Sequence, residues 1–178
     1  TFLLHRVDSN QDEIEVALQL IKERKLKGII FLGGWFSHDE KRLKQINVPF
    51  VLSTISMFEG VDKKIYSSVS VDDVKESKKA VDCLCEYGHE KIVMLAAQPW
   101  DESISGLRVQ GYKKALEERQ IPINENLIRY TFQEETAFTM ENGYKLMKEL
   151  LESDEEFTAV YAISDSMAIG ASKAILES

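Results

Sequence analysis

An acidic side chain follows a strongly apolar run near the end of the chain. Residues 160–163 are apolar, Ser164 and Asp165 interrupt the run, and residues 166–171 form a small-residue segment compatible with a helix. This order is typical of a buried parallel strand that leads into a helix through a very short turn. Ligands bind at the carboxyl ends of strands in open α/β sheets, so Asp165 is placed to accept hydrogen bonds from a polyol, an amine or a base. The same carboxylate can equally cap the following helix, and the sequence leaves both roles open.

Other expected strand ends carry side chains suited to holding a sugar or a nucleobase. They offer carboxylates, a guanidinium and flat aromatic rings: Asp72, Trp100, Asp101, Arg108 and Phe138. Charged groups make strong, directional hydrogen bonds, and aromatic rings pack against the apolar face of a ligand. Asp72 ends its strand without an evident capping role, so it is either a site residue or a solvated loop acid.

Each of the other candidates also has a purely structural interpretation. Asp73 and Glu76 have the spacing of a capping pair, which explains Asp73 better than a binding role does. Arg108 fits a surface arginine on the flank of its helix as well as it fits a ligand contact. Trp100 and Phe138 are of a type that more often packs in a core or a lid than stacks on a ligand.

Several patterns that carry catalysis are missing from the sequence. It contains no G-x-x-x-x-G-K-[ST], no G-x-G-x-x-G and no G-x-S-x-G motif. His5, His38 and His89 are far apart and show no metal-ligand spacing with the cysteines. No residue is nominated as a nucleophile with its base, so we expect a protein that is not an enzyme and needs neither a cofactor nor a metal.

Composition and charge limit the partners of the chain. Its 178 residues are 44% hydrophobic and 29% charged, which suits a globular protein in one domain or two small lobes. A formal net charge of -8 argues against this chain binding the phosphate backbone of a nucleic acid. No apolar run approaches the roughly 20 residues of a membrane span. The chain begins at Thr1 and ends within or just after a helical pattern, so we interpret it as a piece of a longer polypeptide.

Strand and helix patterns alternate along the whole chain. Strands are expected at residues 2–4, 29–32, 50–52, 68–71, 92–95 and 159–163, with a further strand opening at 127–128. Helices are expected after a capping pair at Asn10 and Glu13, over 39–46, after Asp73, over 103–119 and over 140–151. Such alternation indicates right-handed βαβ crossovers, a mostly parallel sheet and the α/β class. A soft compositional seam lies near residues 71–74.

Four motifs occur in order along the second half of the chain. They are Y-G-H-E-K-I at residues 87–92, R-V-Q-G-Y at 108–112, G-Y at 143–144 and S-D-S-M-A-I-G-A at 164–171. Each is modest alone, but together they are specific. The chain resembles the effector-binding core of lactose/galactose-repressor (LacI/GalR) family transcription regulators, and the resemblance spans essentially all of it.

The resemblance implies a periplasmic-binding-protein-like fold, with two Rossmann-like lobes and a ligand cleft between them. The lobes would be residues 1–72 and 73–178, each incomplete because the family's first strand lies upstream and its closing strands lie downstream. The residues that match the family's ligand positions are Asp165 and Arg108, which hold the effector, Asp72 at the crossover, Phe138 over the pocket, and the segment from Trp100 to Ser103.

The resemblance also implies a function and partners. It predicts the sensor core of a dimeric cytoplasmic repressor that responds to a sugar or related metabolite. Operator DNA would be bound through an N-terminal helix-turn-helix domain that this chain lacks. A sugar-type solute-binding protein of an ABC transporter, which shares the fold, is the alternative, and a small α/β enzyme is a third class. An upstream helix-turn-helix or a secretory signal in the full-length sequence separates the first two.

Overall fold

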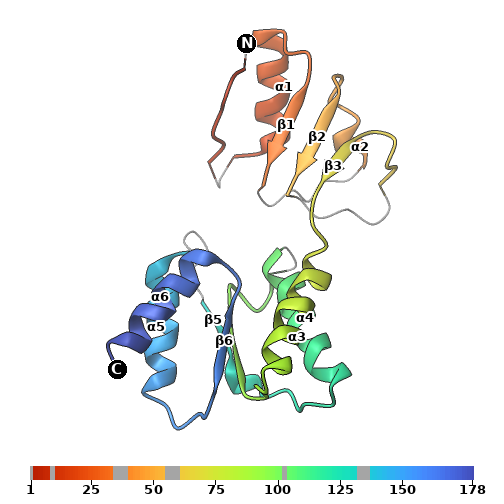
Figure 1. The fold of residues 1–178 in the computed structure, drawn as a ribbon. Coiled ribbons are helices and arrows are strands. Elements are labelled where there is room, and N and C mark those ends of the chain that lie inside the picture. Colours follow the sequence, from red (N-terminus) through yellow and green to blue (C-terminus); the bar gives the residue numbers. More distant parts are fainter. Residues whose placement is uncertain (1, 9–10, 34–39, 55–60, 102–103, 132–136) are drawn as a thin grey trace. The chain divides into compact units, whose positions relative to one another are not determined.

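The chain folds into two compact units. The structure, a computed structural model, describes residues 2–8, 11–33, 40–54, 61–101, 104–131 and 137–178. Unit 1 is Thr1–Val71 and unit 2 is Asp72–Ser178, so the division falls one residue before the expected boundary. The described residues of each unit form one three-stranded parallel sheet, and Figure 1 shows the strands in place. The predicted α/β class with mostly parallel sheets is confirmed.

Unit 1 is built around strand β2. Its elements are α1 (Glu13–Arg24), β1 (Ile29–Leu32), α2 (Glu40–Leu43), β2 (Phe50–Ser53) and β3 (Ser67–Val69). The sheet order is β1-β2-β3, and the register pairs Ile29 with Phe50 and Val51 with Ser67. Phe50 and Leu52 point into a small core that also contains Ile14 of α1. The alternation of buried and half-exposed residues along β2 follows from the two-residue period of a strand.

Two predictions for the start of unit 1 are wrong. Residues 2–4 form no strand, and the Phe2 side chain is 99% exposed, because apolar character alone does not supply a neighbouring strand to pair with. Helix α1 is capped by Asp12, whose carboxylate accepts hydrogen bonds of 3.0 Å from the backbone N–H groups of Ile14 and Glu15. The expected capping residue, Asn10, lies outside the described residues.

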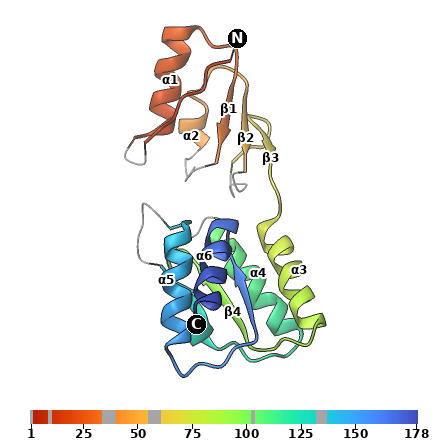
Figure 2. The ribbon, with the colours of Figure 1, turned by 60° about the vertical axis from the view of Figure 1, so that its left-hand side comes forward.

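Unit 2 carries the two longest of the described helices and the larger core. Its elements are α3 (Asp73–Glu86), β4 (Ile92–Ala96), α4 (Ile104–Glu118), a 3-10 turn η1 (Glu125–Leu127), β5 (Ile128–Tyr130), α5 (Met140–Leu151), β6 (Ala159–Ala162) and α6 (Asp165–Leu176). Helices α3 and α4 pack together on one side of the sheet, and α5 and α6 pack together on the other (Figures 1 and 2). This layering covers both faces of the sheet with helices, as parallel sheets require.

The central strand of unit 2 is β4. The sheet order is β5-β4-β6, all five residues of β4 are buried, and the register pairs Met94 with both Ile128 and Tyr161. A strand that is covered on both faces has a continuous apolar sequence. For this reason β4 was predictable from the sequence. The three parallel strands bring their carboxyl ends to one edge of the sheet, where helices α3, α4, α5 and α6 begin.

Tyr112 on α4 links that helix to the first residue of β4. Its hydroxyl is buried and donates a 2.8 Å hydrogen bond to the carbonyl oxygen of Ile92. Burial, and secondarily the carboxylate of Glu125, raises the pKa of Tyr112 to about 12. The folded pKa exceeds the ordinary value of about 10, so the stability linked to the neutral phenol is complete below about pH 10 and is lost as the pH rises towards 12.

We therefore expect unit 2 to lose stability in alkali through this tyrosine. In a Tyr112→Phe variant, the decline in the free energy of unfolding between about pH 10 and 12 becomes shallower. Denaturant titrations at several pH values measure this change. An equal decline in the variant and the parent would contradict the assignment.

Among the described residues, no helix combines the length and the apolar character needed to cross a membrane.

Candidate functional site

The carboxyl edge of the sheet in unit 2 gathers most of the predicted site residues. Trp100 and Asp101 follow β4, Ser164 and Asp165 follow β6, and Arg108 lies in the second turn of α4. The segment that follows β5 is described only to Thr131 and again from residue 137. Ser103, also predicted, lies outside the described residues. Parallel topology brings these segments to one edge because every strand points the same way.

Asp165 is the first residue of α6 and does not cap it. The N-cap is Ser164, whose hydroxyl accepts a 3.3 Å hydrogen bond from the backbone N–H of Met167. Asp165 is exposed, and within the described part of the chain no hydrogen bond or ion pair joins its carboxylate. The capping role considered for Asp165 is therefore wrong, because the neighbouring serine already fills it. The carboxylate is open to solvent at the strand end.

This division of roles predicts different effects on stability. Ser164→Ala removes the cap of α6 and should lower the free energy of unfolding by about 1 kcal/mol. Asp165→Ala removes only a favourable charge in the first turn of α6, which is worth roughly 0.3–1 kcal/mol, and should cost less. Chemical denaturation of both variants measures the order. A larger loss for Asp165→Ala would contradict the capping assignment.

Arg108 is held by two groups from different elements. Its Nε donates a 2.8 Å hydrogen bond to Oδ1 of Asp73 on α3, and its Nη1 donates to the carbonyl oxygen of Ile163, just beyond β6. The arginine side chain retains 30% of its exposure, whereas that of Asp73 retains 6%. Arg108 is thus an anchored group near Asp165 and not a surface arginine on the flank of a helix.

The roles of Asp72 and Asp73 are exchanged relative to the prediction. Asp72 is the N-cap of α3 and accepts a 3.0 Å hydrogen bond from the backbone N–H of Lys75. Asp73 is buried in the ion pair with Arg108, and Glu76 binds Lys79 at 2.8 Å instead of closing a capping box. Acidic residues at adjacent positions satisfy the same sequence pattern, so only the helix start decides which one caps.

The two predicted aromatic residues are largely exposed. Trp100 retains 56% of its exposure and Phe138 retains 45%. Neither side chain fills the core, so the interpretation of core packing is wrong for both. Exposed aromatic rings at a strand edge are suited to packing against the apolar face of a ring-shaped ligand.

Buried polar side chains that the sequence analysis missed shape two loops at this edge. The Ser105 hydroxyl accepts a 3.0 Å hydrogen bond from the backbone N–H of Ala97, which fixes the turn after β4. The Asn142 side chain donates a 3.2 Å hydrogen bond to the carbonyl oxygen of Ala137, which fixes the approach to α5. Both residues lie in the first turn of a helix, a position where small polar residues commonly bind nearby backbone, and that signal was available in the sequence.

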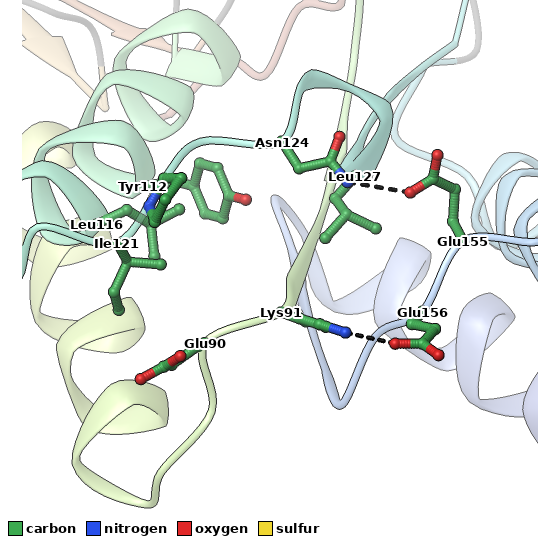
Figure 3. A pocket seen from close by; sticks show the side chains of 10 residues that line it. Glu90, Lys91, Tyr112, Leu116, Ile121, Asn124, Leu127, Glu155 and Glu156 are labelled. Atoms are coloured by element: carbon green, nitrogen blue, oxygen red, sulfur yellow. Dashed lines mark hydrogen bonds and ion pairs between the residues drawn. The ribbon is translucent and has the colours of Figure 1, made fainter.

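A hollow lies at the opposite edge of the same sheet. It has a volume of about 420 Å³ and is lined by Glu90, Lys91, Tyr112, Leu116, Ile121, Pro122, Asn124, Leu127, Glu155 and Glu156 (Figure 3). Lys91 binds Glu156, and this hydrogen bond lowers the pKa of the Glu156 carboxyl. The hollow lies where the strands begin, and it contains none of the predicted site residues. We therefore retain the carboxyl edge, where anchored polar groups converge, as the candidate site.

The described acids of unit 2 do not assemble a metal centre. Within the described ranges, no three His, Cys, Asp or Glu side chains come together as metal ligands. The geometry at the carboxyl edge instead offers hydrogen-bond acceptors at Asp165 and a donor at Arg108, which suits hydroxyl groups.

The whole chain, residues 1–178, matches the family described as periplasmic binding proteins and sugar binding domain of LacI family. The chain belongs to this family. The LacI-family chain is 35% identical over 179 residues to the transcriptional regulator MalR of Clostridium butyricum, covering 99% of this chain and 52% of that protein. It is 30% identical to the catabolite control protein A of Priestia megaterium, covering 94% of this chain and 48% of that protein.

Solved structures resemble this LacI-family chain in fold. The regulator CelR in complex with cellobiose aligns with a TM-score of 0.72 at 27% identity, covering 93% of this chain and 48% of that one. The resemblance inferred from the four motifs is confirmed. The relatives named here are regulators of transcription, and the chain spans about half the length of the curated relatives it matches.

Proposed function

We propose that the chain is the ligand-sensing core of a DNA-binding transcriptional regulator, a repressor whose effector is a sugar or related metabolite. The observation that carries this proposal is the anchored guanidinium of Arg108, which is tied to Ile163 two residues before the open carboxylate of Asp165. A carboxylate accepts hydrogen bonds from sugar hydroxyls, and a guanidinium donates them to hydroxyl oxygens. The cellobiose complex of CelR supports a saccharide as the effector class.

The proposed site consists of the predicted residues together with Asp73, which positions Arg108. Asp165 and Arg108 bind hydroxyl groups, Trp100 and Phe138 cover the apolar face of the sugar ring, and Ser103 contributes a hydroxyl. Asp72 joins them, with one carboxylate oxygen capping α3. The chemistry is binding without turnover and without a cofactor.

Effector binding controls DNA by coupling in this proposal. A ligand that binds one conformation more tightly than another shifts the equilibrium between them, and the same difference changes the affinity for DNA. The operator is bound by an N-terminal domain outside this chain, in a cytoplasmic homodimer. The net charge of -8 supports this division, because an acidic core repels the phosphate backbone.

A solute-binding protein is the second candidate, since the description of the matching family includes periplasmic binding proteins. The full-length sequence distinguishes the two. A helix-turn-helix before this segment supports the regulator, and a secretory signal supports the transport protein.

A thermal-shift screen of sugars and related metabolites on the full-length protein tests the proposed function. A bound effector stabilises the folded state by mass action, by about 2.7 kcal/mol at a concentration of one hundred times its Kd. We expect at least one saccharide to raise Tm and to change the affinity for operator DNA, measured by fluorescence anisotropy. A complete saccharide panel without any shift in Tm would refute the sugar class.

A further inference from the structure

The contacts of Arg108 restrict how it can meet a ligand. Nε is used by Asp73 and Nη1 by the carbonyl oxygen of Ile163, so both nitrogens are committed to the protein itself. Within the described part of the chain, no contact is assigned to Nη2. A guanidinium held at two nitrogens keeps a fixed orientation, and its remaining nitrogen can donate to a ligand without further loss of side-chain entropy.

The same contacts place a negative charge directly beside the positive charge of Arg108. Oδ1 of Asp73 lies 2.8 Å from Nε, and the Asp73 side chain is only 6% exposed. Water screens such a pair weakly, so the carboxylate offsets the field of the guanidinium at any nearby ligand atom. Arg108 therefore acts towards a ligand as an oriented N–H donor more than as a cation.

The other charges at this edge are mostly negative. This edge consists of the strand ends, the first turns of the helices that follow them, and the first turn of α3. Among its described residues, Lys75 is the one basic side chain besides Arg108. The acidic side chains there, besides Asp73, are Asp72, Glu76, Asp101, Glu141 and Asp165. A phosphate group brought to this edge would meet like charges, which oppose the attraction of the helix N-termini that also lie there, and its desolvation would be poorly compensated.

We propose that Asp73 is a positioning and specificity-determining residue that makes this edge accept uncharged polyols, such as unmodified sugars, and reject their phosphorylated or otherwise anionic forms. The inference rests on the proposed function, because it assigns a ligand class to the same site. Asp73 orients Arg108 through the hydrogen bond to Nε and neutralises it through its charge. These two roles can be separated by substitution.

Three variants of the full-length protein separate the roles. Asp73→Asn keeps an oxygen that accepts from Nε but removes the negative charge. Asp73→Ala removes both the acceptor and the charge. Asp82→Asn is the matched control, because Asp82 on α3 pairs with Arg119, the residue after α4, at the far end of these helices from the strand edge. Thermal melts of all three establish that each variant is folded.

The probes are cellobiose, ribose and glucose, the phosphorylated sugars ribose 5-phosphate and glucose 6-phosphate, and inorganic phosphate, all titrated by calorimetry at fixed ionic strength.

For the parent protein, we expect no phosphorylated sugar to bind more tightly than its unmodified form. Asp73→Asn should strengthen binding of the phosphate-bearing probes about tenfold, through the removal of one nearby negative charge, and change the affinity for an unmodified sugar by less than about threefold. Asp73→Ala should weaken binding of the unmodified sugar about tenfold, and the rescue by asparagine would identify the positioning role.

Several results would overturn the inference. Tighter binding of a phosphorylated sugar to the parent protein would do so, as would identical behaviour of Asp73→Asn and Asp82→Asn. If none of these sugars binds the parent, the saccharide panel of the thermal-shift screen decides the proposed function. The inorganic phosphate titration still decides the role of Asp73, because a gain in Asp73→Asn supports charge selection and the absence of a gain contradicts it.

Discussion

Alanine at Asp165 or at Arg108 in the full-length protein is expected to abolish measurable binding of the effector. Each substitution removes a charged hydrogen-bonding group from the carboxyl edge of the sheet in unit 2. Losing such a group leaves ligand hydroxyls without partners and should weaken binding by about 100-fold or more, which isothermal calorimetry detects. Asp165 is exposed at the start of α6, so its loss should leave the fold almost unchanged.

Arg108→Ala carries a second cost, which needs its own control. Asp73 is 6% exposed and would lose its ion-pair partner, so we expect roughly 2 kcal/mol of lost stability. Arg119→Ala breaks a second arginine–aspartate pair, between Asp82 on α3 and Arg119 just after α4. It should lower stability in a similar way but retain effector binding. Unchanged effector affinity in both Asp165→Ala and Arg108→Ala would refute the site assignment.

The largest effect on stability is expected where helices α5 and α6 touch through glycine. A Cβ at Gly143 would lie 2.1 Å from the carbonyl oxygen of Met167, and a Cβ at Gly170 would lie 1.9 Å from that of Met140. Backbone atoms cannot move aside as side chains do, so Gly143→Ala or Gly170→Ala must force the helices apart. We expect a loss of roughly 3 kcal/mol in each case, despite the better helix propensity of alanine. The corresponding fall in Tm is about 10–20 °C.

Ser172→Ala provides the comparison for these variants. Ser172 is exposed on α6, two residues after Gly170, and alanine there should change the free energy of unfolding by less than about 0.5 kcal/mol. Denaturant unfolding of the three proteins measures the difference. A loss below about 1 kcal/mol for both glycine variants would show that the helices can separate at little cost.

The candidate site was partly predictable because local patterns carry part of its chemistry. An apolar run followed by Ser164 and Asp165 predicts a strand end wherever the strand lies in the sheet. The pairing of Arg108 with Asp73 was not predictable in this way, since the two residues are 35 positions apart on different helices. Caps were misassigned by one residue at Asp165 and Asp73 because neighbouring polar residues satisfy the same pattern.

The sequence by itself determined the alternation of strands and helices, the parallel α/β class, the family and the edge at which polar side chains collect. These follow from apolar periodicity and from motifs, which are local properties of the chain. Only the tertiary structure decided three further points. Residues 2–4 have no strand partner, Ser164 and not Asp165 caps α6, and Asp73 pairs with Arg108 and orients it. The reason is physical: a carboxylate caps a helix, pairs with an arginine or faces a ligand according to which donors packing brings within about 3 Å, and residue type does not encode that distance.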